Sequence, residues 1–297
     1  MWIKASGALT ESVFQLTTAV SSHLLVIGDA SALIDTGVSA ATDRLFEELG
    51  SVLGEGGELD LVLLTHAHFD HVGGLPALRK RYQGMEVLGS PGTAELLGNE
   101  DYCRELFQKN AECAAALGVE LEFEEQEWIE AVRIDRIIGD GDAIDMGDDV
   151  EIKMIASPGH TPDSVSYLIT PDAALAGGEA VGSYGGRDRI ANCFTSDFSQ
   201  YVESLERLSG LDLKVLSFSH AGALTGELVP KYFLDARQAA EIFREQVKER
   251  LAQGELVDEV FAALLPDWQA QNMSPEGPFR FEQQETLRLM IRAAAAE

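Results

Sequence analysis

The amino-acid sequence predicts a layered α/β domain followed by a C-terminal helical extension. Short apolar runs typical of strands dominate the first 36 residues. A further apolar run, residues 61–64, leads through a polar loop into a helical pattern, which is the strand–loop–helix order of α/β proteins. After Gly226 the apolar residues recur at three- and four-residue steps, as on one face of a helix.

Each element follows from its local pattern. We expect an opening meander of strands at residues 13–20, 24–28 and 32–35, and further strands at 61–64, 150–156, 164–169, 173–176 and 214–218. Helices are expected at 39–53, 72–82, 93–117 with a break near Gly98, and 198–208. The acidic segment 120–149 is poorly periodic, and its position suggests an insertion.

These elements predict two parts of the chain. Residues 1–226 form the main domain, with a helical insertion at about 92–118, and residues 227–297 form the extension. The extension should hold a long helix with a face from Phe233 to Leu251, a second helix at 255–265 that Pro266 stops, and a third at 281–296, with the loop MSPEGP before the third. Because short helices need a partner surface, we expect the extension to pack over the main domain and cover its active site.

Composition excludes several classes of partner. The 22 basic and 50 acidic side chains give a net charge of −28, which opposes nonspecific binding to nucleic acid or to an anionic membrane. No run approaches the ~18 apolar residues that span a bilayer. The three cysteines form no CxxC pair, so they indicate neither a disulfide framework nor a thiolate zinc site. We therefore expect a cytoplasmic protein, and the sequence leaves open whether it forms a homodimer.

The strongest chemical signal is the run THAHFDH at residues 65–71, where an apolar strand ends and a helix is expected to begin. If the chain stays extended through Asp70, alternation places His66, His68 and Asp70 on one side, and the turn into the helix brings His71 round. Imidazole and carboxylate ligands suit zinc, iron or manganese. One short segment can thus serve two divalent cations, whereas the alternative interpretation is an ordinary solvated turn.

Two more histidines follow strand-like runs. His160 lies in SPGHTPDS and His220 in SFSHAG, and the glycines Gly159 and Gly222 allow a close approach of the backbone. A lone histidine is usually structural. Beside the first motif, we expect both to be metal ligands delivered by loops at strand ends.

The HxHxDH pattern resembles the signature of the metallo-β-lactamase superfamily, and the similarity covers roughly residues 10–226. The segment IDTG at residues 34–37 also looks like an early segment of that family, with Asp35 behind the ligands. The resemblance implies an αββα sandwich. It further implies that one metal is held by His66, His68 and His160, and the other by Asp70, His71 and His220.

One departure from the family concerns the carboxylate between the two metals. The family usually has an aspartate there, whereas the matching stretch AGGEA at residues 176–180 offers Glu179. Its extra methylene reaches about 1.5 Å further, and the adjacent glycines would let the backbone retreat. Alternatively, Glu179 is a solvated acid and the second metal is weak or absent.

The resemblance implies a hydrolase that uses metal-activated hydroxide, because a bound divalent cation lowers the pKa of water from 15.7 to roughly 7. Asp70 would orient this nucleophile and relay protons. Length, insertion and helical tail are similar to the branch of aminobenzoylacetyl-CoA thioesterases and hydroxyacylglutathione hydrolases, so a small-molecule thioester or ester is the expected substrate. A lactone of an acyl signal, a phosphodiester and a metal-bearing regulatory module with little turnover are the alternatives.

The loop SYGGRDR at residues 183–189 predicts substrate contacts. We expect Arg187 or Arg189, in this loop with Tyr184, to hold an anionic group of the substrate by paired hydrogen bonds. Phe233 or Phe243 of the extension would cover the acyl portion. The alternative for the arginines is a pair of ordinary ion pairs with local acids.

Overall fold

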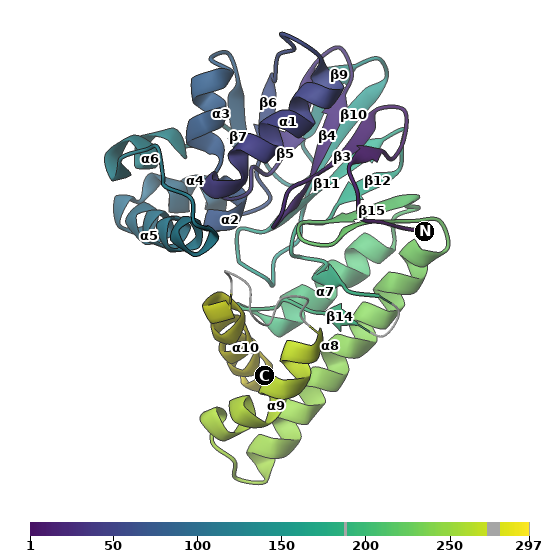
Figure 1. Cartoon of the computed structure of the whole chain (residues 1–297). Coiled ribbons are helices and arrows are strands. Elements are labelled where there is room, and N and C mark those ends of the chain that lie inside the picture. The colour runs from purple at the N-terminus through teal and green to yellow at the C-terminus, as the bar shows by residue number, and fades with distance from the viewer. Residues whose placement is uncertain (187–188, 272–279, 297) are drawn as a thin grey trace.

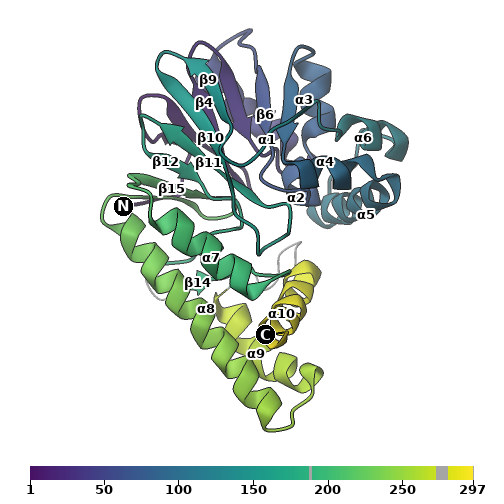
Figure 2. The same ribbon diagram turned by 180° about the vertical axis from the view of Figure 1, so that it is seen from behind.

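Two β-sheets stack face to face in the computed structural model, which describes residues 1–186, 189–271 and 280–296 (Figure 1). Helices cover the outer face of each sheet, and three further helices extend below the sandwich (Figures 1 and 2). The layers therefore follow the order helix, sheet, sheet, helix. This is the αββα sandwich, with a C-terminal helical extension, that the sequence predicts.

The first sheet combines an antiparallel meander with a parallel half. Within the described residues its seven strands are, in spatial order, β2 (Gly7–Ala8), β3 (Val13–Thr17), β4 (Ser22–Ile27), β5 (Ser31–Ile34), β6 (Leu61–Leu63), β7 (Glu86–Gly89) and β8 (Arg136–Ile137). The predicted meander is confirmed as β3 to β5. The run β5 to β8 is parallel, so the chain leaves β5 and β6 at the same edge of the sheet.

The second sheet supplies the opposing layer. Its seven described strands are, in spatial order, β1 (Trp2–Ile3), β16 (Gly222–Thr225), β15 (Val215–Phe218), β12 (Ala174–Ala176), β11 (Val165–Thr170), β10 (Val150–Ala156) and β9 (Ala143–Gly147). A separate two-stranded ribbon consists of β13 (Ser183–Tyr184) and β14 (Ile190–Ala191). Because β12 and β15 are parallel, the loops that follow them leave the sheet at one edge.

The helices divide between the two outer faces. Over the first sheet lie a short 3₁₀ turn (Ser39–Ala41) and α1 (Thr42–Leu53), α2 (Phe69–Val72), α3 (Leu75–Arg81), α4 (Pro91–Gly98), α5 (Glu100–Leu117) and α6 (Glu125–Ala131). Over the second lies α7 (Phe198–Ser209). The extension below consists of α8 (Leu228–Ala252), which contacts α7 and β16, and of α9 (Val257–Gln271) and α10 (Arg280–Ala295), which pack on α8. The predicted break near Gly98 is confirmed, because the side chain of Asn99 accepts hydrogen bonds from the first backbone N–H groups of α5 and so begins a new helix.

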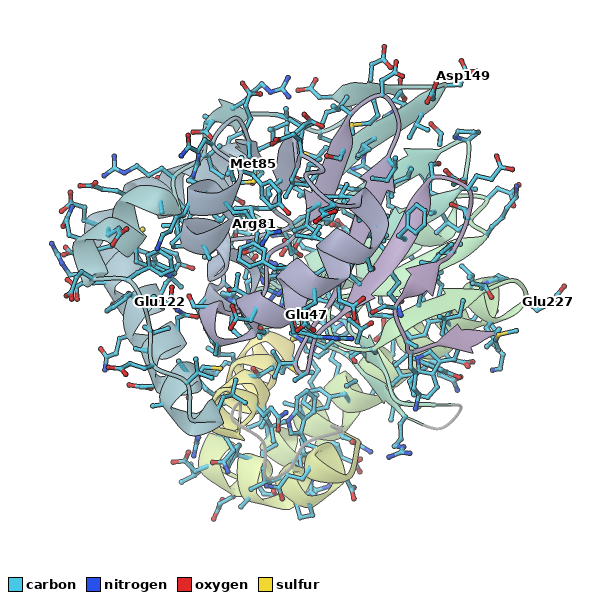
Figure 3. All side chains as sticks on the ribbon, turned by 45° about the horizontal axis from the view of Figure 1, so that its top comes forward. Glu47, Arg81, Met85, Glu122, Asp149 and Glu227 are labelled. Atoms are coloured by element: carbon cyan, nitrogen blue, oxygen red, sulfur yellow. The ribbon has the colours of Figure 1, made fainter. Side chains whose placement is uncertain are left out.

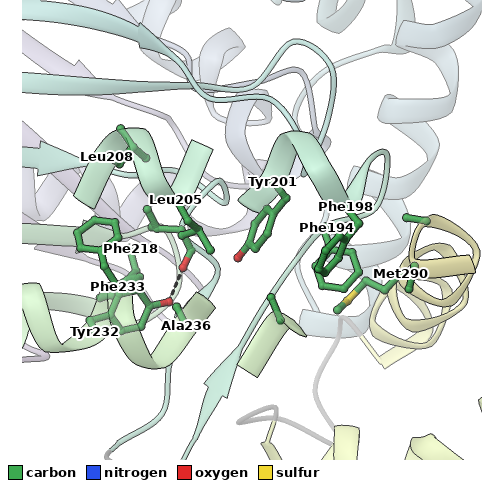
Figure 4. Packing of buried hydrophobic residues seen from close by; sticks show 14 of the residues in the cluster. Phe194, Phe198, Tyr201, Leu205, Leu208, Phe218, Tyr232, Phe233, Ala236 and Met290 are labelled. Carbon is green, nitrogen blue, oxygen red and sulfur yellow. Dashed lines mark hydrogen bonds between the residues drawn. The ribbon is translucent and has the colours of Figure 1, made fainter. Parts of the chain in front are cut away.

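Three hydrophobic clusters hold these layers together. One lies between the sheets, where Val26 and Leu63 of the first sheet share a cluster with Ile152 and Tyr167 of the second. A second packs helices on the first sheet, around the fully buried Trp128. The third joins α7, the second sheet and the C-terminal helices, and Figure 4 shows its aromatic centre around Tyr201 and Phe218 with Met290 of α10 at one side. The extension thus shares a core with α7 and the second sheet.

The acidic side chains lie mainly on the surface. In Figure 3 the labelled acids Glu47, Glu122, Asp149 and Glu227 project from the protein, and all four are exposed. Such acids keep their hydration, which explains how a chain with a net charge of −28 still packs three apolar clusters. Among the described residues, no helix combines the length and the apolar character that crossing a membrane requires.

Two sequence predictions are wrong. Residues 120–149 are not an insertion, because they carry α6, whose Trp128 and Ile129 are buried, and the edge strands β8 and β9. The short lengths of these elements hid their periodicity. Pro266 does not stop the second C-terminal helix: α9 continues to Gln271 because burial of Leu264 and Trp268 on either side of the proline offsets the lost backbone hydrogen bond.

Other elements gave too little signal to be predicted. The strands β1, β2, β7, β13, β14 and β16 are each only two to four residues long. Such short runs form strands only because a neighbouring strand pairs with them. The predicted MSPEGP loop lies outside the described residues.

Candidate metal centre

The predicted ligands meet at one edge of the sandwich, where loops leave the ends of the strands. His66 and His68 follow β6, His160 follows β10, Glu179 follows β12 and His220 follows β15. The sheet pairing places these strand ends together, although the first and last of these ligands, His66 and His220, are 154 residues apart along the chain. The ligands form two groups.

The first group contains His66, His68, His160 and Glu179, whose ligand atoms all lie within 4.8 Å of one another. The Nδ1 atom of His68 is 3.0 Å from Nε2 of His66 and 3.1 Å from Nε2 of His160. A neutral imidazole has one donor and one acceptor nitrogen, and three nitrogens at one point cannot all be satisfied by one another. This convergence of lone pairs fits a cation between them.

The second group contains Asp70, His71 and His220. Nε2 of His220 is 3.4 Å from Oδ2 of Asp70. Nε2 of His71 is buried and has no hydrogen-bond partner in the described part of the chain, although its Nδ1 lies 2.8 Å from Oδ2 of Asp35. A buried polar atom without a partner is costly, so this nitrogen also fits a ligand to a metal. Two divalent cations such as zinc, iron or manganese suit the donor atoms of both groups.

Glu179 lies between the two groups. Its Oε2 is 2.7 Å from Nε2 of His160 and 3.7 Å from Nε2 of His66, while its Oε1 is 3.6 Å from Nε2 of His220. The carboxylate therefore presents one oxygen to each group. This is the placement that a bridging ligand requires, and the bridge itself stays a prediction.

The local geometry of the HxHxDH segment differs from the expectation. The chain is extended only as far as His68, and α2 begins at Phe69. Asp70 therefore lies in the first helical turn with His71, and the turn directs it to the second group instead of alternating with His66 and His68.

The electrostatics of the site keep several ligands in the form that binds a cation. Burial lowers the pKa of His68 to about 4 and that of His66 well below its usual value, so both rings are neutral at pH 7. Burial alone would raise the pKa of Asp70, but His71 and His220 outweigh it and lower that pKa to about 2. The carboxylate of Asp70 is therefore ionised throughout the physiological range.

Backbone and side-chain acceptors orient the imidazole rings from behind. Nδ1 of His160 donates to the carbonyl oxygen of Cys193 at 2.8 Å, and Nδ1 of His220 donates to that of Val20 at 2.9 Å. Each bond leaves Nε2 as the ring nitrogen that faces the centre. Although burial opposes it, Cys193 and Glu179 raise the pKa of His160, and Asp70 and Glu179 raise that of His220 to about 9, so a cation bound there displaces the Nε2 proton of each ring. Asp35, expected behind the ligands, accepts from Nδ1 of His71 and from the backbone and hydroxyl of Thr65. Sequence reasoning missed Cys193 and Val20, because any residue offers a carbonyl oxygen.

Sequence reasoning also missed a pair of contacts on the residue between the first two histidines. The backbone N–H of Ala67 donates to Oδ2 of Asp163 at 2.9 Å, and the hydroxyl of Tyr102 donates to the carbonyl oxygen of Ala67 at 3.1 Å. Asp163 stands three residues after His160, which is the only signal the sequence offered. The loop that carries His66 and His68 is thus held from two sides.

A cavity of about 1030 Å³ opens over both ligand groups and reaches His68, Asp70, His160, Glu179 and His220. Its walls come from the β3–β4 loop, α5, residues 182, 183 and 185 around β13, residues 191–193 and 195 from the end of β14 onward, and the helices α9 and α10. The C-terminal extension therefore contributes to the cavity through its last two helices.

The aromatic residues predicted to contact the substrate do not line the cavity. Phe233 is 4% exposed and Phe243 packs on Phe194 with ring centroids 5.6 Å apart, so both lie on the core side of α8 and neither lines the cavity. The apolar face of α8 packs against α7 and the second sheet, so it is not available to a substrate. Tyr184 packs edge-on against Trp2 at 5.0 Å and is likewise absent from the cavity wall.

The predicted anion-binding arginines gain no support from the described residues. Arg189 is exposed and does not line the cavity. Arg187 lies outside the described residues.

Comparisons with known proteins agree with this geometry. A family model described as the metallo-beta-lactamase superfamily matches residues 17–220. A hydroxyacylglutathione hydrolase of Acidiphilium cryptum is 31% identical over 229 residues, which cover 77% of this chain and 74% of the relative. A metallo-beta-lactamase fold-containing protein of Sulfurisphaera tokodaii is 27% identical over 219 residues, which cover 71% and 76%.

Solved structures show the same fold. A metallo-beta-lactamase family protein from Thermus thermophilus superposes with a TM-score of 0.65 at 19% identity, covering 97% of this chain and 96% of that chain. A beta-lactamase domain protein from Burkholderia ambifaria gives a TM-score of 0.67 at 19% identity, covering 99% and 91%. Since the family model spans most of the sequence and includes both ligand groups, this chain belongs to the metallo-beta-lactamase superfamily.

Proposed function

We propose that this protein is a metal-dependent hydrolase of small-molecule thioesters. The observation that carries the proposal is that two clusters of imidazole and carboxylate ligands, with Glu179 between them, converge at the floor of a large cavity. The identity of 31% to a hydroxyacylglutathione hydrolase, an enzyme named for an acylated thiol, supports the thioester class. The chain has three cysteines, and no disulfide joins them in the described residues, which fits a reducing, cytoplasmic compartment.

A bound divalent cation would supply acidity here, since it lowers the pKa of water toward 7 and polarises an oxygen of the substrate. His66, His68 and His160 would hold the first cation, Asp70, His71 and His220 the second, and Glu179 both. The protein itself then has two tasks, which are to orient the attacking water and to move its proton.

Asp70 is the residue best suited to both tasks. Its carboxylate is ionised at neutral pH and lies beside His220, at the cavity floor. It accepts a hydrogen bond from the attacking water and takes up its proton as the new C–O bond forms. The C–S bond then breaks and releases a thiolate, which the proton from Asp70 neutralises.

The leaving group explains why a thioester suits this arrangement. A free thiol has a pKa of about 8.5, so the thiolate departs near neutral pH without a strong general acid. Asp70 is ionised at neutral pH, so it has no proton to donate to a leaving group until it has taken one from the attacking water. An alkoxide leaving group would need more assistance, which disfavours simple esters.

Metal analysis combined with a substrate panel tests the proposal. We expect two metal ions per chain and turnover of acyl-CoA or acylglutathione thioesters, with kcat/KM at least about tenfold above that for lactones and phosphodiesters. Full metal content without turnover of any thioester would overturn the thioester assignment. One weakly bound metal and no turnover would instead favour a regulatory module.

A further inference from the structure

The cavity is larger than the reacting group requires. Its volume of about 1030 Å³ is at the upper end of the roughly 300–1,000 Å³ typical of pockets that hold drug-sized ligands. The ligand groups occupy only its floor, so most of the space lies beside residues that take no part in the chemistry. The residues that line that space indicate the chemistry of the part of the substrate that does not react.

One wall is a single face of α5. The lining residues Tyr102, Leu106, Lys109 and Leu117, with Glu105 and Glu112, recur at helical spacing. Tyr102 marks the end nearest the ligands, because its hydroxyl bonds the carbonyl oxygen of Ala67 between His66 and His68. From Tyr102 to Leu117 the helix rises about 22 Å at 1.5 Å per residue. The wall is therefore long in one direction.

A second wall comes from the extension. Gln283, Gln284, Thr286 and Leu289 of α10 and Trp268 of α9 line the cavity. In both Figures 1 and 2, α10 lies below the sandwich on the side of α5. This wall offers amide and hydroxyl groups together with apolar surface.

The charges along these walls balance. Lys4, Lys109 and Arg288 line the cavity, as do the acids Glu105, Glu112 and Glu285. The guanidinium of Arg288 is also stacked 3.9 Å above the ring of Phe261. Away from the metal ligands, the walls carry no excess of either sign, which favours an uncharged ligand segment over a strongly anionic one.

We propose that the substrate carries an extended, uncharged chain that lies along α5, beneath α10, for up to about 20 Å from the ligand groups. The proposal rests on the thioester function, whose reacting carbon would lie over the metals. The chain consists of methylene groups interrupted by few amides, which Gln283 and Gln284 can pair. It belongs either to the acyl group or to the thiol side, and the experiment separates these sources.

Binding of thioethers, which cannot be hydrolysed, tests the proposal on the metal-loaded protein. In one series of N-acetylcysteamine thioethers the alkyl chain grows from about two to about twelve carbons, and in the other a short alkyl group is kept while the thiol side grows from N-acetylcysteamine to pantetheine. Calorimetry should show Kd falling by about fourfold per added methylene in the series whose chain enters the cavity, until the wall ends.

Tryptophan variants locate the chain. Glu105→Trp on α5 and Thr286→Trp on α10 should reduce the ratio of Kd between the shortest and longest thioether at least tenfold, because the indole fills the space between the walls. Gln108→Trp and Arg292→Trp are matched controls, since both residues are exposed on the same helices and neither lines the cavity. The controls should keep the ratio.

The outcomes separate this inference from the proposed function. A Kd independent of length in both series overturns the extended chain, as does an equal loss of the ratio in variants and controls. Absence of turnover with every thioester overturns the proposed function only, because the thioether affinities still report on the cavity.

Discussion

The carboxylate of Asp163 accepts a hydrogen bond from the backbone N–H of Ala67, with Oδ2 2.9 Å from the nitrogen. The same oxygen accepts from the hydroxyl of Thr93 at 2.9 Å, and Asp163 is only 6% exposed. Ala67 lies between two predicted ligands, so this contact fixes the peptide that sets the angle between His66 and His68. The hydroxyl of Tyr102 holds the other side of the residue.

Asp163→Ala should therefore weaken metal binding by about 10- to 100-fold, as substitutions behind metal ligands commonly do. The change leaves the N–H of Ala67 buried without an acceptor and lets the loop relax. Metal affinity is measured by competition with a chromogenic chelator. Asp212→Ala, at an exposed position, is the control. Unchanged affinity in Asp163→Ala would show that the loop holds its shape without this carboxylate.

His66→Ala and His160→Ala should each cost about one metal ion per chain and abolish turnover, because each removes a neutral nitrogen from the first group. Elemental analysis after dialysis measures the metal, and a thioester assay measures the rate. Either variant with full metal content and full rate would refute its assignment as a ligand.

Asp70→Asn should act more selectively than the histidine variants. The amide oxygen is a weaker ligand and cannot accept the proton, so kcat should fall by about 10²- to 10⁴-fold while the first group keeps its metal. Comparison of metal content with kcat separates the two effects. Wild-type kinetics would remove Asp70 from the catalytic machinery.

Glu179→Ala should lose one metal ion and most turnover. Glu179→Asp should resemble it, because the shorter side chain withdraws from His160 and His220. Elemental analysis of both variants measures the number of metal ions bound per chain. Two full metals in Glu179→Ala would mean that the bridge comes from another group.

Metal removal should lower thermal stability, since the converging ring nitrogens, and Nε2 of His71, which has no partner among the described residues, then lose the cation. Added zinc at about 100 times its dissociation constant should restore about 2.7 kcal/mol of unfolding free energy per site. Calorimetric scans with a chelator and with zinc measure the difference. The double variant His160→Ala, Asp70→Asn is the control and should respond much less.

Local sequence was sufficient for the regular elements and for the kinds of ligand. The meander at 13–35, the strand 150–156 and the long C-terminal helix each repeat one periodicity over enough residues to be recognised. The HxHxDH run carries its chemistry in adjacent residues, so a metal site could be predicted without the fold. Short strands such as β16 and the helix through Pro266 could not, because packing and pairing with distant residues stabilise them.

Sequence alone therefore determined which donor atoms the centre offers, because imidazoles and carboxylates are properties of the residues themselves. Tertiary structure decided how these atoms are shared: a helical turn at Phe69 sends Asp70 to the second group, and the ends of β12 and β15 set Glu179 beside His220. It also decided which helices line the cavity, since the aromatic side chains of α8 are buried in packing while α10 faces the open space. Contacts between residues far apart in the chain depend on how the sheets pair, and no local pattern carries that information.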